Sequence, residues 1–135
     1  METKVFFSFA VKDLKKSVEF FTKVGFTFNP MFTDETATCM IISETIYAML
    51  LTEDKFKSFT KKQIADTSKT QEVAINLTAG SREAVDAIIE KALAAGASEP
   101  SPAQDQGFMY SREFEDPDGH NWSYFYMDMS ALPKQ

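Results

Sequence analysis

The chain has 135 residues, 44% of them hydrophobic and 25% charged, which suits one packed domain, and no apolar run approaches the ~20 residues of a membrane-spanning helix. Its net charge is -6, because residues 69–135 carry eleven acids against five Lys and Arg, whereas residues 1–68 carry nine of each. Such an acidic chain is a poor candidate for binding the phosphates of a nucleic acid. Cys39 is the only cysteine, which excludes an internal disulfide and a Cys-based metal site.

The first half of the chain predicts the element order β-α-β-β-β. The N-terminal segment lacks the features of a signal peptide, so we expect a cytoplasmic protein, and residues 5–11 are typical of a strand. Asp13 is a predicted N-cap of a helix over residues 14–24, and Gly25 ends it. Three strand segments follow, at 25–30 (broken by Asn29-Pro30), 36–42 and 45–52.

The second half repeats this order after a polar linker at residues 53–70, which holds one predicted helical turn near residues 56–59. Residues 72–78 indicate a strand, and Ser81 caps a helix that ends at Gly96. A short strand is expected from Ala97, then a Pro-rich loop at 100–107, and then strands at 108–115 and 121–128 around the turn Asp116-Pro117-Asp118-Gly119.

A doubled unit of this kind predicts an α+β fold of two βαβββ modules. We expect residues 1–135 to form a single domain, with module one at about 3–52 and module two at about 71–130. Each module would form a curved mixed sheet, and the two sheets would enclose a cleft.

Two segments carry a resemblance to a known family. V-K-D-L-K-K-S-V-E-F-F-T-K-V-G-F (11–26) and F-E-D-P-D-G-H-N-W (114–122) resemble the opening and closing signatures of the vicinal-oxygen-chelate superfamily, which includes glyoxalases, bleomycin-resistance proteins and extradiol dioxygenases. The resemblance implies a cleft with a divalent metal at its base, which chelates two adjacent substrate oxygens. It also implies a homodimer.

The four metal-ligand positions that the resemblance implies are occupied mostly by side chains that do not bind metal. The first falls on Phe6, the second near Tyr47 or Met49, the third on Glu72 and the fourth on Ser123, four residues after Gly119. Only Glu72 is a plausible ligand, whereas a catalytic site needs about three. We therefore expect either no cofactor or an unidentified divalent metal, and Glu72 is the best candidate for a catalytic residue.

A pocket without metal would be apolar with a few polar groups. The predicted ligand-binding residues are Phe6, Ser8, Tyr47, Met49, Glu72, Asn76, Tyr110, Arg112, Ser123 and Phe125. Arg112 either contacts an anionic ligand or pairs with Glu72 or Asp128. Glu72 in an apolar cavity would need a raised pKa, an arginine partner or a cation.

Structural roles are the simpler interpretation of the remaining candidate residues. His120, the only histidine, is expected to be a turn residue, and Cys39 a buried inert thiol. Glu113 and Glu115 share one strand face, where they could bind a cation but more simply form the solvent face.

Two functions stay open at this point. The first is a small-molecule-binding protein with a degenerate metal site. The alternative is a divergent metal-dependent lyase or dioxygenase of the same superfamily. In both cases the expected partners are a small-molecule ligand and a second copy of the chain, with no nucleic acid and no membrane.

Overall fold

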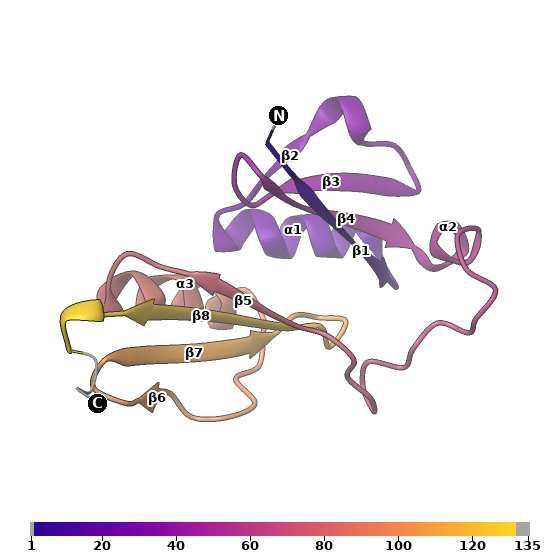
Figure 1. Ribbon diagram of the computed structural model, residues 1–135. Coiled ribbons are helices and arrows are strands. Elements are labelled where there is room, and N and C mark those ends of the chain that lie inside the picture. The colour runs from indigo at the N-terminus through magenta and orange to yellow at the C-terminus, as the bar shows by residue number, and fades with distance from the viewer. Residues whose placement is uncertain (1, 132–135) are drawn as a thin grey trace. The chain divides into compact units, whose positions relative to one another are not determined.

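The structure is a computed structural model that describes residues 2–131 of the chain; residue 1 and residues 132–135, at the ends of the predicted domain, lie outside the described residues. Its elements run β1 (Val5–Val11), α1 (Leu14–Val24), β2 (Thr27–Asn29), η1 (Pro30–Phe32), β3 (Ala37–Ile41), β4 (Ile46–Thr52), α2 (Glu53–Lys57), β5 (Ala74–Thr78), α3 (Arg82–Ala94), β6 (Gln104–Asp105), β7 (Met109–Glu115), β8 (Asn121–Met127) and η2 (Met129–Ala131) (Figure 1). None of the helices among these residues is long and apolar enough to cross a membrane.

The chain forms two compact units that divide between Asp66 and Thr67, inside the predicted linker. Each unit contains one four-stranded mixed sheet, with the order β1-β4-β3-β2 in sheet A and β5-β8-β7-β6 in sheet B. In both sheets the first strand of the unit runs parallel to the last, and the remaining neighbours are antiparallel. The predicted α+β fold of two βαβββ modules is therefore confirmed.

Both long helices begin and end where the sequence predicts, because their caps are local. The Asp13 carboxylate accepts a hydrogen bond from the Lys16 backbone N–H at 3.2 Å, and Gly25 adopts a φ of 122°, which favours glycine. The Ser81 hydroxyl accepts from the Ala84 N–H at 3.0 Å in the same way.

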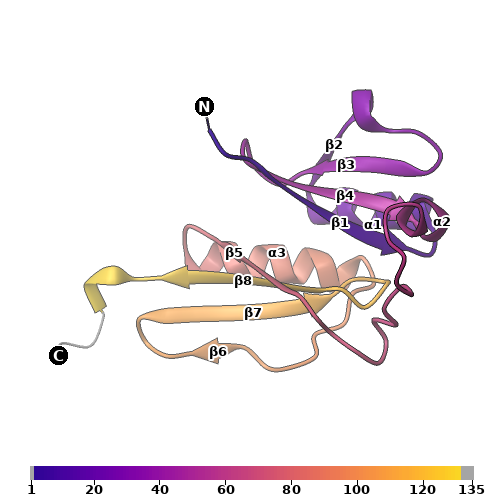
Figure 2. The same ribbon diagram turned by 45° about the vertical axis from the view of Figure 1, so that its right-hand side comes forward.

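Each helix covers one face of its own sheet and builds a core there. In the first unit Phe20, Phe21 and Val24 of α1 are buried, and in the second Val85, Ile89 and Ala92 of α3 are buried. Helix α3 packs along the sheet strands β7 and β8, as the ribbon shows (Figure 2). Residues alternate along a strand, so the opposite face of each sheet, here called its open face, carries the other set of side chains.

Three predicted segments differ from the structure. The strand expected from Ala97 is only an isolated bridge between Ser98 and Glu115, and the expected loop at 100–107 contains the two-residue strand β6. The helical turn expected near 56–59 begins earlier, at Glu53, because the Thr52 hydroxyl accepts from the Lys55 N–H and caps it. Pairing with β7, which no local pattern reports, decides the first two.

Candidate functional site

The open face of sheet A exposes a pair of stacked aromatic rings. Phe6 of β1 lies opposite Tyr47 of β4, with ring centroids 4.7 Å apart and planes 12° from parallel. Phe6 is 54% exposed, although phenylalanine is normally buried. The Lys4 ammonium lies 5.8 Å from the Tyr47 ring centroid. We call Phe6 and Tyr47 the aromatic platform; it offers a flat apolar surface with a cation beside it.

The next row of side chains on the open face of sheet A contains a buried thiol. Ser8 lies opposite Met49, and Met49 lies opposite Cys39 of β3. Cys39 is buried, and burial raises the pKa of its thiol. The expected buried thiol is confirmed, and the raised pKa disfavours the thiolate that a nucleophile needs.

The open face of sheet B carries a polar hollow. Asn76 of β5, Ser123 of β8 and Glu113 of β7 lie side by side in one row across three strands. The next row places Ser111 opposite Gln104 of β6. The hollow has a volume of about 200 Å³, and the residues that line it are Asn76, Ser101, Pro102, Gln104, Ser111, Arg112, Glu113 and Ser123.

Among residues 2–131, Glu113 is the one carboxylate that lines this hollow, and it accepts hydrogen bonds from neutral donors. Its carboxylate accepts a hydrogen bond from the Ser101 hydroxyl at 2.5 Å and one from the Asn121 side-chain amide at 3.3 Å. Sequence reasoning placed Glu113 and Glu115 on one face of their strand, which is confirmed. It did not identify the hollow, because Ser101 and Gln104 come from a segment expected to be a loop.

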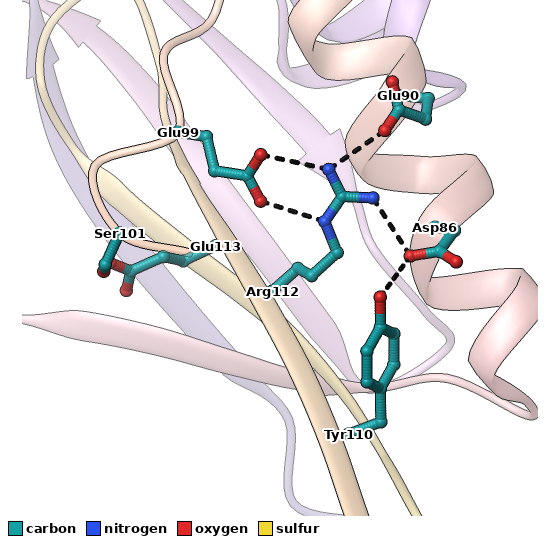
Figure 3. A network of polar contacts seen from close by, with 7 residues as sticks. All are labelled: Asp86, Glu90, Glu99, Ser101, Tyr110, Arg112 and Glu113. Carbon is teal, nitrogen blue, oxygen red and sulfur yellow. Dashed lines mark hydrogen bonds and ion pairs between the residues drawn. The ribbon is translucent and has the colours of Figure 1, made fainter. Parts of the chain in front are cut away.

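Arg112 borders the hollow but directs its guanidinium to the helix side of sheet B (Figure 3). It donates to both carboxylate oxygens of Glu99, at 2.9 and 3.0 Å, and contacts Asp86 and Glu90 of α3 at 3.0 and 2.9 Å. The Glu99 carboxylate is the main reason why the pKa of Arg112 is raised. The prediction that Arg112 pairs with Glu72 or Asp128 is therefore wrong.

Tyr110 lies on the same helix side and completes this cluster. Its hydroxyl donates to Asp86 at 2.6 Å, and this bond raises the pKa of Tyr110 and lowers that of Asp86. Phe125 lies on the open face, opposite Ser111. The prediction that Tyr110 and Phe125 line one surface is wrong, because their strand positions place them on opposite faces of sheet B.

The turn between β7 and β8 is built around a buried carboxylate. Asp116 accepts hydrogen bonds from the backbone N–H groups of Asp118 and His120 and from the indole N–H of Trp122, at 3.0, 2.9 and 3.1 Å. Burial raises its pKa. His120 lies in this turn, as expected, and Gly119 has a φ of 85°.

A comparison with profiles of protein families identifies the family of this chain. The profile described as "Glyoxalase/Bleomycin resistance protein/Dioxygenase superfamily" matches residues 5–124. The chain belongs to this superfamily. No curated protein gave a match in sequence.

Solved structures agree with the superfamily in fold. A hypothetical protein from S. aureus superposes with a TM-score of 0.79 at 24% identity, covering 93% of this chain and 94% of the other. The fosfomycin resistance protein FosX from Listeria monocytogenes has a TM-score of 0.67 at 18% identity, with 97% and 98% covered. TnmS3, an antibiotic binding protein from Streptomyces sp. CB03234, has a TM-score of 0.67 at 16% identity, with 94% and 97% covered.

The superfamily's divalent metal does not fit the donor set of this chain. Phe6 offers only carbon, Met49 offers a thioether sulfur, and Ser123 offers a neutral hydroxyl. Glu72 lies in a bend before β5, exposed to solvent, and no described side chain pairs with its carboxylate. Within residues 2–131, no three His, Cys, Asp or Glu side chains are grouped closely enough to hold a metal ion.

Proposed function

We propose that this chain is a small-molecule-binding protein of the superfamily that contacts its ligand through the open face of sheet A, without a catalytic metal. The observation that carries the proposal is the aromatic platform, in which Phe6 stands at the first family ligand position yet is 54% exposed and stacked on Tyr47. A ring that served only the core would be buried, as Phe20 and Phe21 are.

The chemistry of the platform indicates the kind of ligand surface that it accepts. A flat aromatic or otherwise apolar group can cover the stacked rings and remove their exposed carbon from water. The Lys4 ammonium beside the Tyr47 ring favours a ligand with an anionic substituent at its edge. FosX is a fosfomycin resistance protein and TnmS3 an antibiotic binding protein, so drug-like ligands of this kind are consistent with the proposal.

The competing function is a divergent metal-dependent lyase or dioxygenase, and the exposed carboxylate of Glu72 is the feature that favours it. Metal analysis of protein purified without chelator separates the two. We expect well below one divalent metal ion per chain. A stoichiometric metal that Glu72→Gln removes would refute the metal-free binding proposal and favour the lyase or dioxygenase.

The binding surface is tested with 1-anilinonaphthalene-8-sulfonate, an apolar ring system that carries one sulfonate. Its fluorescence should rise on binding, and Phe6→Ala should weaken binding by about tenfold, since a buried aromatic contact of ~1.4 kcal/mol corresponds to that factor. Phe32→Ala is the matched control, because Phe32 is a similarly exposed ring, at 59%, in η1 of the same unit. Equal losses in the two variants would refute the platform as the binding surface.

The expected homodimer and cytoplasmic location stay part of this proposal. Sedimentation equilibrium at several protein concentrations measures the oligomeric state and so tests the homodimer.

A further inference from the structure

The polar hollow of sheet B has a composition that the fold does not require. Most of its lining side chains are neutral hydroxyls and amides, namely Asn76, Ser101, Gln104, Ser111 and Ser123. A sheet face that packs only against protein is normally apolar, because burying polar groups without partners costs free energy. Polar side chains from four strands and a loop that converge on one concave site are the arrangement of a ligand subsite.

The internal repeat supplies an independent comparison. Ser8 lies five residues before the cap Asp13, and Asn76 lies five residues before the cap Ser81, so the two occupy equivalent positions. The row Ser8, Met49, Cys39 of sheet A therefore corresponds to the row Asn76, Ser123, Glu113 of sheet B. That comparison places Glu113 at the position of a buried thiol.

The same fold is thus built in the first unit with a small apolar group at the position of Glu113. The fold therefore does not explain why the second unit has a carboxylate at this position. The carboxylate has no structural ion pair, because the donors that reach it, Ser101 and Asn121, are neutral.

The charge of Glu113 is not balanced by a cation within the described part of the hollow. Arg112 is the only Lys, Arg or His residue on the lining, and its guanidinium is held on the other side of the sheet by Glu99, Asp86 and Glu90. A half-buried carboxylate with neutral donors attracts a cationic group from solvent. The acidic excess of residues 69–135 adds a favourable potential for such a group.

We propose that the hollow binds a primary ammonium group with a neighbouring hydroxyl. The ammonium donates to the free lone pairs of the Glu113 carboxylate, and the hydroxyl exchanges hydrogen bonds with Asn76 and Ser123. A volume of about 200 Å³ is smaller than the ~300–1,000 Å³ of a complete ligand pocket, so the hollow takes an amino-alcohol headgroup rather than a whole drug-sized molecule.

The experiment titrates isotope-labelled full-length protein with ethanolammonium at pH 7 and follows backbone amide shifts by NMR. Ethylene glycol, in which a hydroxyl replaces the ammonium, is the matched neutral probe. We expect ethanolammonium to shift the amides of Asn76, Ser111, Glu113 and Ser123 with a millimolar Kd. Ethylene glycol should bind at least tenfold more weakly.

Glu113→Gln tests the assigned residue, because it keeps the shape and the acceptor for Ser101 but removes the charge. This variant should weaken ethanolammonium binding at least tenfold. Glu115→Gln is the control, since Glu115 lies on the same strand and the same face, two residues away, and does not line the hollow. It should leave the Kd within twofold, which excludes a general effect of net charge.

Three results would overturn the inference: no shift at the hollow with ethanolammonium, equal binding of the two probes, or binding that survives Glu113→Gln. None of these results bears on the aromatic platform, because the proposed function is tested separately by the binding of anilinonaphthalene sulfonate. Loss of dye binding with intact ethanolammonium binding would refute the platform and leave the hollow standing.

Discussion

Arg112→Met should destabilise the protein strongly at neutral pH. The Arg112 side chain is only 12% exposed, and the substitution keeps its apolar stem but removes the guanidinium that donates to Glu99, Asp86 and Glu90. The three carboxylates would then face one another without a cation, and the half-buried Glu99 would lose both of its charged hydrogen bonds.

The burial of each partner sets the size of the effect. Breaking a fully buried ion pair costs ~3–5 kcal/mol, whereas an exposed pair is worth ~0–1 kcal/mol. Glu99 is 23% exposed and bonds through both oxygens, so its loss falls toward the first range. Asp86 and Glu90 are 47% and 64% exposed and belong to the second. We expect a total loss of about 2–4 kcal/mol.

The loss should depend on pH in a defined direction. The hydrogen bond from Tyr110 and then the one from Arg112 lower the pKa of Asp86. A carboxyl whose pKa falls on folding contributes stability above its unfolded value of ~3.9 and loses it as the pH falls. In the variant Asp86 loses the Arg112 guanidinium, so the pKa of its carboxyl is lowered less and it takes up a proton at higher pH. The difference between the two proteins should therefore shrink as the pH falls below about 4.

Unfolding in guanidinium chloride, followed by circular dichroism at pH 7 and near pH 3.5, measures the loss of stability and its dependence on pH. Arg82→Met is the control, since the Arg82–Asp105 pair is 38% and 54% exposed and its loss should cost about 1 kcal/mol or less. The reasoning fails if Arg112→Met costs no more than this control at pH 7, or if its cost stays constant on acidification.

Three further substitutions test other parts of the second unit by the same unfolding assay. Asp116→Asn should cost about 1–3 kcal/mol, because the new amide N–H groups would face the indole N–H of Trp122 and leave a buried donor without an acceptor. Gly119→Ala should cost about 2–4 kcal/mol, since a Cβ there would lie 2.8 Å from the carbonyl oxygen of Thr67 at a φ of 85°, combining backbone strain with overpacking. Ser81→Ala should cost about 1 kcal/mol, because it removes the N-cap acceptor of α3.

Matched variants separate these causes from general intolerance. Gly80→Ala should change stability by less than about 0.5 kcal/mol, because nothing lies within 4 Å of its Cβ and its φ is ordinary. Ser81→Asp keeps a capping acceptor and should retain most of the stability. Equal losses for Gly119→Ala and Gly80→Ala, or for Ser81→Ala and Ser81→Asp, would contradict the assigned causes.

Local signals in the sequence were sufficient for the element order and for both helices. Asp13, Ser81 and Gly25 act within one turn of their own position, so their chemistry is readable without the rest of the chain. The doubled βαβββ pattern, together with its two signatures, was sufficient for the fold class and the family.

Which residues share a surface was decided by the tertiary structure. Alternation along β7 predicts that Arg112 and Glu113 face opposite sides, but not which side the helix covers. The helix covers the side of Arg112, where Asp86, Glu90 and Glu99 contact its guanidinium. Glu113 gained its hollow because Ser101 and Gln104 come from a segment whose pairing is non-local.

The sequence by itself determined both long helices and most of the strands, because caps, turns and hydrophobic periods act over a few residues, whereas β6 depends on its pairing with β7. Only the tertiary structure decided that Phe6 stacks on Tyr47 and that Asn76, Ser123 and Glu113 form one row. Strand register joins residues that are tens of positions apart, and the free energy that selects it comes from the packing of the whole sheet rather than from any one segment.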